Sequence, residues 1–143
     1  MLSWADADRY CRARGWRLPT EAEWQRAMSA GAEDHRYPWG DDPRPGGRPR
    51  FNHWEGADHH ENRAEDGHVH TSPVRAYPPN AWGLYDPVGN VWQFVADWWA
   101  ADAYARLTPG ALDPQGPADG WAKVGRGGSW WCSEGTCEGY GLW

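Results

Sequence analysis

The sequence predicts an α+β fold that is irregular and rich in coil, and three observations support this class. The chain has 143 residues, about the size of one ordinary domain. It contains 13 Trp but only 2 Phe and 2 Met, so large amphipathic rings must fill much of its interior. It also contains 18 Gly and 12 Pro, which divide a chain into turns. This composition argues against a helix bundle and favours one domain over residues 1–143.

Two short helices are predicted near the N-terminus, each from a capping box. In both boxes Ser or Thr is followed three residues later by an acidic residue, and the pairs are Ser3 with Asp6 and Thr20 with Glu23. The first helix should run from about 4 to 14, because Gly15 offers a C-cap. The second should start at Glu21, end near Ser29 and be followed by Gly31.

The rest of the chain shows no long hydrophobic period, repeat or low-complexity tract. Residues 37–50 are dominated by turn formers and are expected to run over the surface. Three short apolar pieces, bounded by Pro and Gly signals, are candidate strands: 72–77, 90–99 and 123–131.

The charge and hydropathy patterns limit the classes of partner. The net charge is −6 and no basic stripe is present, so nucleic acid is not an expected partner. No apolar run is long enough to span a bilayer, and the N-terminus lacks the order of a signal peptide. We therefore expect a cytoplasmic protein, a monomer, that does not bind membranes.

Two of the three cysteines are close in sequence. Cys132 and Cys137 lie in the segment RGGSWWCSEGTC, and both sulfurs can reach one ion if the chain turns between them. The spacing alone is compatible with copper, with a disulfide or with two inert thiols. Cys11 lies on the first predicted helix and is expected to be a small buried apolar residue.

Seven sequence blocks, in a fixed order, carry a resemblance to a known family. They are RLPTEAEW (17–24), YPWGDD (37–42), NHWEG (52–56), AEDGH (64–68), PPNAWGLYDPVGNVWQF (78–94), DWW (97–99) and RGGSWWC (126–132). In this order the blocks resemble formylglycine-generating enzymes, the sulfatase-modifying factor family. The match covers nearly the whole chain.

This resemblance implies a formylglycine-generating-enzyme fold, which is related to C-type lectin-like domains. It also implies an oxidation reaction. Catalytic members oxidise a cysteine of a sulfatase to Cα-formylglycine, using molecular oxygen and copper(I) held by two cysteines. Carried over to this sequence, Cys132 and Cys137 are the copper(I) ligands, and Ser129 is a further catalytic residue. Copper(I) is soft and accepts few ligands, so two thiolates leave room for the sulfur of a cysteine-bearing protein or peptide substrate.

The resemblance also implies two calcium sites. The first would use the side chains of Asn52 and Asp66 with the carbonyls of His53 and His68. The second would use Asp86, Gly89, Val91 and Gln93. Ca²⁺ prefers carboxylate, amide and carbonyl oxygens, which a coil-rich domain can offer. A zinc site made by the histidines is not expected, because the spacing of His53, His59, His60, His68 and His70 fits no common zinc pattern.

The sequence departs from the family pattern around the second cysteine. Family members commonly carry a His after the first cysteine, a Tyr before the second and Arg-Tyr-Arg after it. The corresponding residues here are Ser133, Thr136 and 139–141 (Gly-Tyr-Gly). A non-catalytic relative that binds a peptide, protein or carbohydrate is therefore the main alternative. A relative of iron-dependent sulfoxide synthases ranks last, because their helical partner domain is not present in this sequence.

Two further expectations concern the domain edges and the tryptophans. The sequence ends before the residues that normally close a family domain and begins inside a block that usually follows a longer region, so residues 1–143 are expected to be a partial domain. Most of one tryptophan group should lie in the core, the alternative being a peptide groove. This group comprises Trp92, Trp98, Trp99, Trp130 and Trp131.

Overall fold

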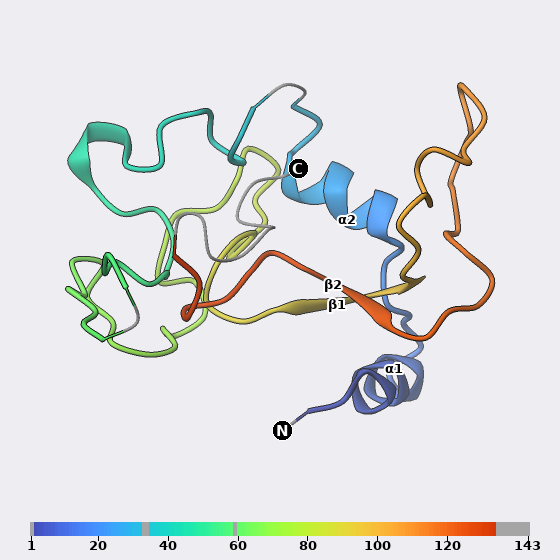
Figure 1. Cartoon of the computed structure of the whole chain (residues 1–143), viewed down its shortest axis with the longest axis horizontal. Helices are drawn as coiled ribbons and strands as arrows, with labels where there is room; N and C mark the ends of the chain where they lie inside the picture. Colours follow the sequence, from blue (N-terminus) through green and yellow to red (C-terminus); the bar gives the residue numbers. More distant parts are fainter. Residues whose placement is uncertain (1, 33–34, 59, 134–143) are drawn as a thin grey trace. The chain divides into compact units, whose positions relative to one another are not determined.

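Few regular elements are present in the computed structural model, which describes residues 2–32, 35–58 and 60–133 (Figure 1). The elements are α1 (Trp4–Ala13), α2 (Glu21–Met28), the 3-10 helix η1 (Pro45–Gly47), β1 (Gln93–Trp98) and β2 (Lys123–Arg126). The two strands pair in one sheet, and turns and irregular segments make up the rest of the described chain. The predicted fold class, α+β, irregular and coil-rich, is confirmed.

The chain separates into two compact units. The first unit comprises Met1–Gln25 and Phe94–Arg126, and the second comprises Arg26–Gln93 and Gly127–Trp143. The boundaries fall within α2 and β1, so each unit is built from two segments that are distant in sequence. That residues 1–143 form one partial domain stays a prediction.

The first helix begins and ends as predicted. Ser3 Oγ accepts a hydrogen bond from the Asp6 N–H at 3.2 Å, and the Asp6 carboxylate accepts one from the Ser3 N–H at 3.1 Å. Gly15 follows the helix with φ +74°, and its N–H donates to the Arg12 carbonyl. No residue of α1 is fully buried, and Cys11 is a partly exposed free thiol. The prediction that Cys11 is buried is therefore wrong, because this face of α1 remains accessible to solvent.

The second helix also starts at its predicted capping box. The Glu23 N–H donates to Thr20 Oγ1 at 3.2 Å, and the Thr20 N–H donates to Glu23 Oε2 at 2.8 Å. Trp24 is the buried residue of α2, and the guanidinium of Arg126 lies 4.9 Å from the centre of its ring. The capping box thus sets the start of the helix, and Trp24 anchors it in the first unit.

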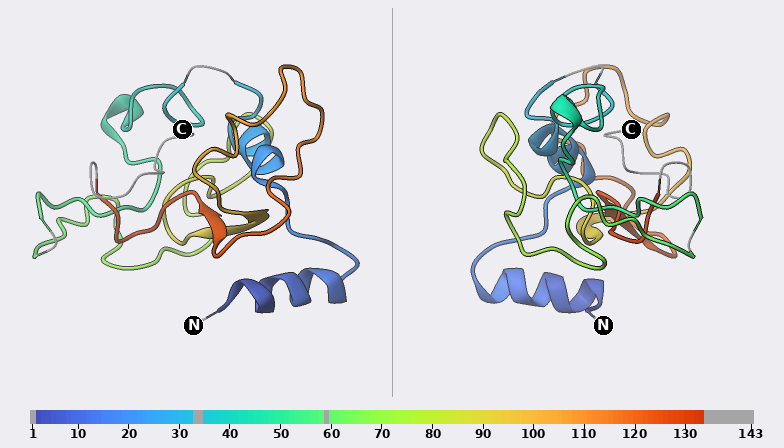
Figure 2. Two further views of the ribbon diagram at one scale, coloured as in Figure 1. Left: turned by 45° about the vertical axis from the view of Figure 1, so that its right-hand side comes forward. Right: turned by 90° about the vertical axis from the view of Figure 1, so that its left-hand side faces the viewer.

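The core of the first unit forms around the sheet, which Figure 2 shows from two further sides. Val95 on β1 is fully buried. The Trp4 indole N–H donates to the Val95 carbonyl at 2.7 Å. The Lys123 ammonium lies 4.1 Å from the ring centre of Trp4 and 3.8 Å from that of Trp98, and donates to the Ala96 carbonyl at 2.8 Å. Two indoles and one carbonyl therefore hold this lysine.

The second unit has its own small core, made of Tyr37, Phe51, Val88 and Cys132 with Trp39 packed against it. Tyr37 stacks on Trp39 with ring centres 5.4 Å apart. The expectation that 37–50 runs over the surface is wrong for Tyr37, which is buried in this core, whereas residues 39–50 are partly or fully exposed.

Only two of the three candidate strands form. The segments 90–99 and 123–131 contain β1 and β2, whereas 72–77 is irregular. There the Ser72 N–H donates to Asn90 Oδ1, so a side chain takes the place of a neighbouring strand.

The tryptophan expectation is largely wrong. Trp92, Trp99 and Trp131 are exposed, and Trp98 and Trp130 are only partly buried. The described helices include none with the length and apolar character needed to cross a membrane.

Candidate functional site

Cys132 occupies a buried position in the core of the second unit. Its residue is only 1% exposed, among the rings of Tyr37 and Phe51 and the side chain of Val88. Ser129 Oγ lies 3.4 Å from the Cys132 sulfur, and the Cys132 N–H donates to the Ser129 carbonyl at 3.1 Å. The structure therefore brings the predicted catalytic serine against the predicted copper ligand.

The chain around Cys132 is fixed by the backbones of distant segments. The Trp54 N–H donates to the Cys132 carbonyl at 2.9 Å, and the Trp130 N–H donates to the Asn90 carbonyl at 2.9 Å. The Trp54 and Trp131 ring centres lie 4.7 Å apart. Two separate pieces of chain, around Trp54 and around Asn90, thus hold the segment 129–132 in an otherwise irregular region.

The second predicted copper ligand cannot be placed. Cys137 lies outside the described residues, as do Thr136 and 139–141 of the altered segment. Cys132 is disulfide-bonded, so its sulfur could bind copper only after reduction. Ser133, which stands where relatives commonly have His, is buried beside Cys132.

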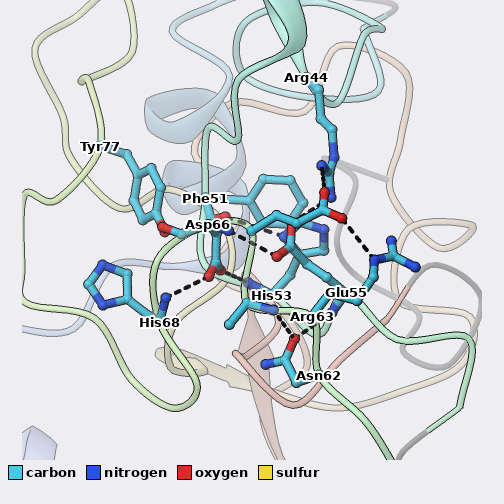
Figure 3. A network of polar contacts seen from close by, with 11 residues as sticks. Arg44, Phe51, His53, Glu55, Asn62, Arg63, Asp66, His68 and Tyr77 are labelled. Carbon is cyan, nitrogen blue, oxygen red and sulfur yellow. Dashed lines mark hydrogen bonds and ion pairs between the residues drawn. The ribbon is translucent and has the colours of Figure 1, made fainter.

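The first predicted calcium group is brought together in the second unit. Asp66 Oδ2 accepts from the His53 N–H at 3.2 Å, and Asp66 Oδ1 accepts from the His68 N–H at 2.8 Å. Figure 3 shows the Asp66 carboxylate between these two residues. Asp66 therefore connects the two segments that carry this predicted ligand set.

Asn52, the fourth member of this group, carries an unsatisfied oxygen. The residue is 1% exposed, and its Nδ2 donates to the His70 carbonyl at 2.7 Å. Its Oδ1 is buried without a hydrogen-bond partner among the described residues. A buried amide oxygen with no donor is a ready ligand for a hard cation, so this group fits Ca²⁺.

A polar network surrounds the first calcium group (Figure 3). The Glu55 carboxylate forms an ion pair of 2.5 Å with Arg44 and accepts from the Asp66 N–H at 2.9 Å. The Tyr77 hydroxyl donates to the Asp66 carbonyl at 3.3 Å, and burial together with the nearby Asp66 raises the pKa of Tyr77. Tyr77 therefore stays a neutral donor at physiological pH.

Among the described contacts of the second predicted calcium group, one joins two of its members. The Gln93 amide donates to the Asp86 carbonyl at 2.8 Å, and Asp86 Oδ2 accepts from the Arg75 N–H at 2.9 Å. The Gly89 N–H donates to the Gly127 carbonyl, and the Val91 side chain is exposed. The structure thus joins Asp86 to Gln93, while a common cation position for all four residues stays a prediction.

The histidines do not form a metal centre in the described part of the chain. No group of three or more His, Cys, Asp or Glu side chains there could hold a metal ion. His53 is buried and stacks on Phe51 with ring centres 4.3 Å apart. A cation in this unit would therefore depend on amide and carbonyl oxygens as well as carboxylates.

Sequence reasoning missed the residues that support Asp66. Glu55, Arg44 and Tyr77 were not among the candidate residues, because they are separated from Asp66 by eleven or more positions and follow no period. The sequence did offer one signal for Glu55. It lies in the NHWEG block, two positions after His53, a predicted calcium ligand.

The fold and these sites define a coil-rich α+β domain with a buried cysteine beside a serine and an oxygen-lined candidate cation site. Residues 1–140 match the family model described as the sulfatase-modifying factor enzyme 1-like domain, and the chain belongs to this family. The resemblance seen in the sequence is confirmed.

Similar proteins include formylglycine-generating enzymes and a relative whose name says that it is inactive. The formylglycine-generating enzyme of Thermomonospora curvata is 47% identical over 140 residues, which are 97% of this chain and 46% of that protein. The inactive C-alpha-formylglycine-generating enzyme 2 of Bos taurus is 47% identical over 112 residues, which are 77% of this chain and 36% of that protein. The chain thus spans less than half the length of these curated relatives.

A solved structure supports the fold. Treponema denticola variable protein 1 superposes with a TM-score of 0.64 and 30% sequence identity, over 88% of this chain and 39% of that one. The similarity extends over most of the chain, in agreement with the family assignment.

Proposed function

We propose that this protein is a copper-dependent oxidase of the formylglycine-generating type, which converts a cysteine of a sulfatase to Cα-formylglycine with molecular oxygen. The observation that carries the proposal is the buried Cys132, with Ser129 Oγ 3.4 Å from its sulfur, in a chain that is 47% identical to a protein named formylglycine-generating enzyme. Cys137 would supply the second thiolate once both sulfurs are reduced.

The donor set suits a soft metal. Copper(I), when bound, would supply a thiolate-binding centre that also reacts with oxygen. Cys132 is buried in one apolar cluster with Tyr37, Phe51 and Val88, which limits the access of water to it. Ser129 holds a hydroxyl against the same sulfur, so it can donate to the thiolate and orient it.

The overall reaction requires a reductant. Conversion of the substrate's Cβ from a thiol-bearing carbon to an aldehyde, with water supplying the oxygen and sulfur leaving as hydrogen sulfide, releases two electrons. Reduction of oxygen to water consumes four, so two more electrons must come from an external thiol. That thiol would also keep Cys132 reduced.

We also propose that calcium binds at Asn52, His53, Asp66 and His68, and that Asp86, Gly89, Val91 and Gln93 form a second calcium site. The unsatisfied Asn52 Oδ1 supports the first site. The Asp86 to Gln93 hydrogen bond supports the second only by joining two of its members.

Copper(I) titration under reducing conditions tests the role of Cys132. The Cys132→Ala variant should lose tight copper binding, whereas Cys11→Ala, at the partly exposed thiol of α1, should bind copper as the unmodified protein does. If Cys132→Ala binds copper as tightly as the unmodified protein, the proposal is wrong.

The second candidate is a non-catalytic domain that binds a peptide, protein or carbohydrate. The changed residues around Cys137 favour it, as does the similarity to a relative named inactive. Mass spectrometry of a cysteine-bearing sulfatase peptide, incubated with copper-loaded protein, oxygen and a thiol, separates the two functions. A binding domain would leave the peptide cysteine unchanged, whereas the oxidase would produce the aldehyde.

A further inference from the structure

The side chain of Glu55 is completely inaccessible to solvent, in contrast to most carboxylates. Two polar contacts of the carboxylate compensate for this burial, and the backbone of Glu55 makes a third contact. Its Oε1 pairs with Arg44 at 2.5 Å, its Oε2 accepts from the Asp66 N–H at 2.9 Å, and its own N–H donates to Asn62 Oδ1 at 3.1 Å. Glu55 therefore connects its own segment to those of Arg44, Asn62 and Asp66 in the second unit.

The contact with Asp66 links Glu55 to the proposed calcium site. The backbone N–H of Asp66 is fixed by Glu55, and the carboxylate of the same residue accepts from the N–H groups of His53 and His68. The Glu55 hydrogen bond thus holds the backbone from which the Asp66 carboxylate extends, and the two histidine N–H groups hold the carboxylate itself. Outer contacts of this kind orient metal ligands in other proteins.

The charges of this network are unequal. Its arginines are Arg44 and Arg63, and its carboxylates are Glu55, Glu65 and Asp66. Arg44 is shared by Glu55 and Glu65, and Arg63 pairs with Glu65. Within the described residues Asp66 makes no ion pair, so its carboxylate, unlike those of Glu55 and Glu65, is not paired with an arginine.

We propose that Glu55 is a positioning residue for the calcium site: its buried carboxylate, neutralised by Arg44, holds the Asp66 backbone so that the Asp66 carboxylate and Asn52 Oδ1 can bind one Ca²⁺. This inference rests on the calcium site proposed above. Glu55 acts through its hydrogen bond to Asp66 and not through its charge.

Two neutral variants of similar size isolate that hydrogen bond. Glu55→Gln keeps an acceptor for the Asp66 N–H, whereas Glu55→Met does not. Isothermal titration of the intact protein with calcium should show affinity about 10-fold or more weaker for Glu55→Met. Glu55→Gln should stay within about threefold of the unmodified protein. Equal losses in the two variants would contradict the proposal.

Glu65→Gln is the matched control. It removes the same charge from the same partner, Arg44, but its side chain is half exposed and the Asp66 N–H donates to Glu55 and not to the Glu65 carboxylate. Its calcium affinity should stay within about threefold of the unmodified value. A loss as large as that of Glu55→Met would show that charge alone matters and would overturn the proposal.

A stability measurement separates positioning from a merely structural role. The rise in melting temperature on saturation with calcium should be smaller for Glu55→Met than for Glu55→Gln, whatever the calcium-free melting temperatures are. If Glu55→Met does not fold, Glu55→Asp serves instead, because its shorter carboxylate keeps the charge but cannot reach the Asp66 N–H. It should also lose about 10-fold in calcium affinity.

Failure of the underlying site has a different signature. If the unmodified protein binds no calcium, or if Asn52→Ala and Asp66→Ala bind it unchanged, the calcium site and the role of Glu55 are both wrong. If those two variants lose calcium but Glu55→Met does not, only the role of Glu55 is wrong. Copper(I) titration of the same variants reports on the oxidase proposal independently.

Discussion

The first unit contains α1, the sheet and the start of α2, with Trp24 and Val95 buried among them. The second unit has η1 and the end of α2 as its described helical structure, and amide side chains hold much of its irregular chain. Asn52, Asn80 and Asn90 each donate to a carbonyl of a segment at least 18 positions away.

Backbone groups need partners whether or not a helix or sheet supplies them. Where neither does, as in the second unit, short polar side chains take over this function. The candidate site residues lie in that unit, so a substitution there can change stability and ligand binding together. The following experiments test this contrast between apolar burial in the first unit and side-chain hydrogen bonding in the second.

The largest effect is expected for Trp24→Ala in the first unit. Trp24 is 2% exposed, so its loss should lower the free energy of unfolding by about 4 kcal/mol. Trp121→Ala is the control, because that ring is 83% exposed and its loss should cost at most about 0.5 kcal/mol. Urea denaturation measures both. Similar values for the two variants would contradict the role of apolar burial.

Gly89→Ala in the second unit should cost about 3 kcal/mol in the free energy of unfolding. Gly89 has φ +75°, and an added Cβ would lie 2.3 Å from the Asn52 carbonyl oxygen and 2.9 Å from Phe51 Cδ2. Gly83→Ala separates strain from crowding, since its φ is +82° but the space around it is open. It should cost about 1 kcal/mol. Equal losses by urea denaturation would exclude a crowding effect.

Asn80→Ala should cost about 2 kcal/mol in the second unit. The Asn80 amide donates to the carbonyls of Ala27 and Met28 at the end of α2, and its Oδ1 accepts from two N–H groups of the following turn. The control is Gln115→Ala, which removes an exposed amide and should change stability by less than about 0.5 kcal/mol. Thermal unfolding followed by circular dichroism would compare them, and an unaffected Asn80→Ala would contradict the contrast.

The smallest effect concerns Glu23 in the first unit. Hydrogen bonds from Arg17 and from the Thr20 N–H lower the pKa of Glu23 from 4.5 to about 2. Because the folded-state pKa is lowered, the stabilisation is complete above pH 4.5 and is lost as the pH falls through about 2. The Arg17 pair is exposed, so we expect only about 1 kcal/mol.

Glu23→Gln tests this pH dependence. Unfolding of the variant and of the unmodified protein should differ near neutral pH and converge as the pH approaches 2. A difference that stays constant over this range would mean that ionisation of Glu23 does not contribute to stability.

Sequence reasoning predicted the local features well. Both helices depend on capping boxes whose members are three residues apart, so their starts could be read directly from the chain. The pair of Ser129 with Cys132 is also local, and the structure brings the two residues into contact.

The features that sequence reasoning missed depend on contacts between distant segments. Trp131 is exposed although it neighbours the buried Cys132, since burial in irregular chain follows no period. The segment 72–77 resembled a strand but has no neighbouring strand, because Asn90 binds Ser72 instead. Glu55 reaches Asp66 across eleven positions, and no spacing rule predicts such a pair.

The position of Lys123 between two indoles has a spectroscopic consequence. Protons above the face of an aromatic ring are shifted upfield in nuclear magnetic resonance spectra by the ring current. The terminal methylene protons of Lys123, next to an ammonium within about 4 Å of both the Trp4 and Trp98 ring centres, should therefore resonate well apart from those of an ordinary lysine. Their resonance would report directly whether α1 is packed on the sheet in solution.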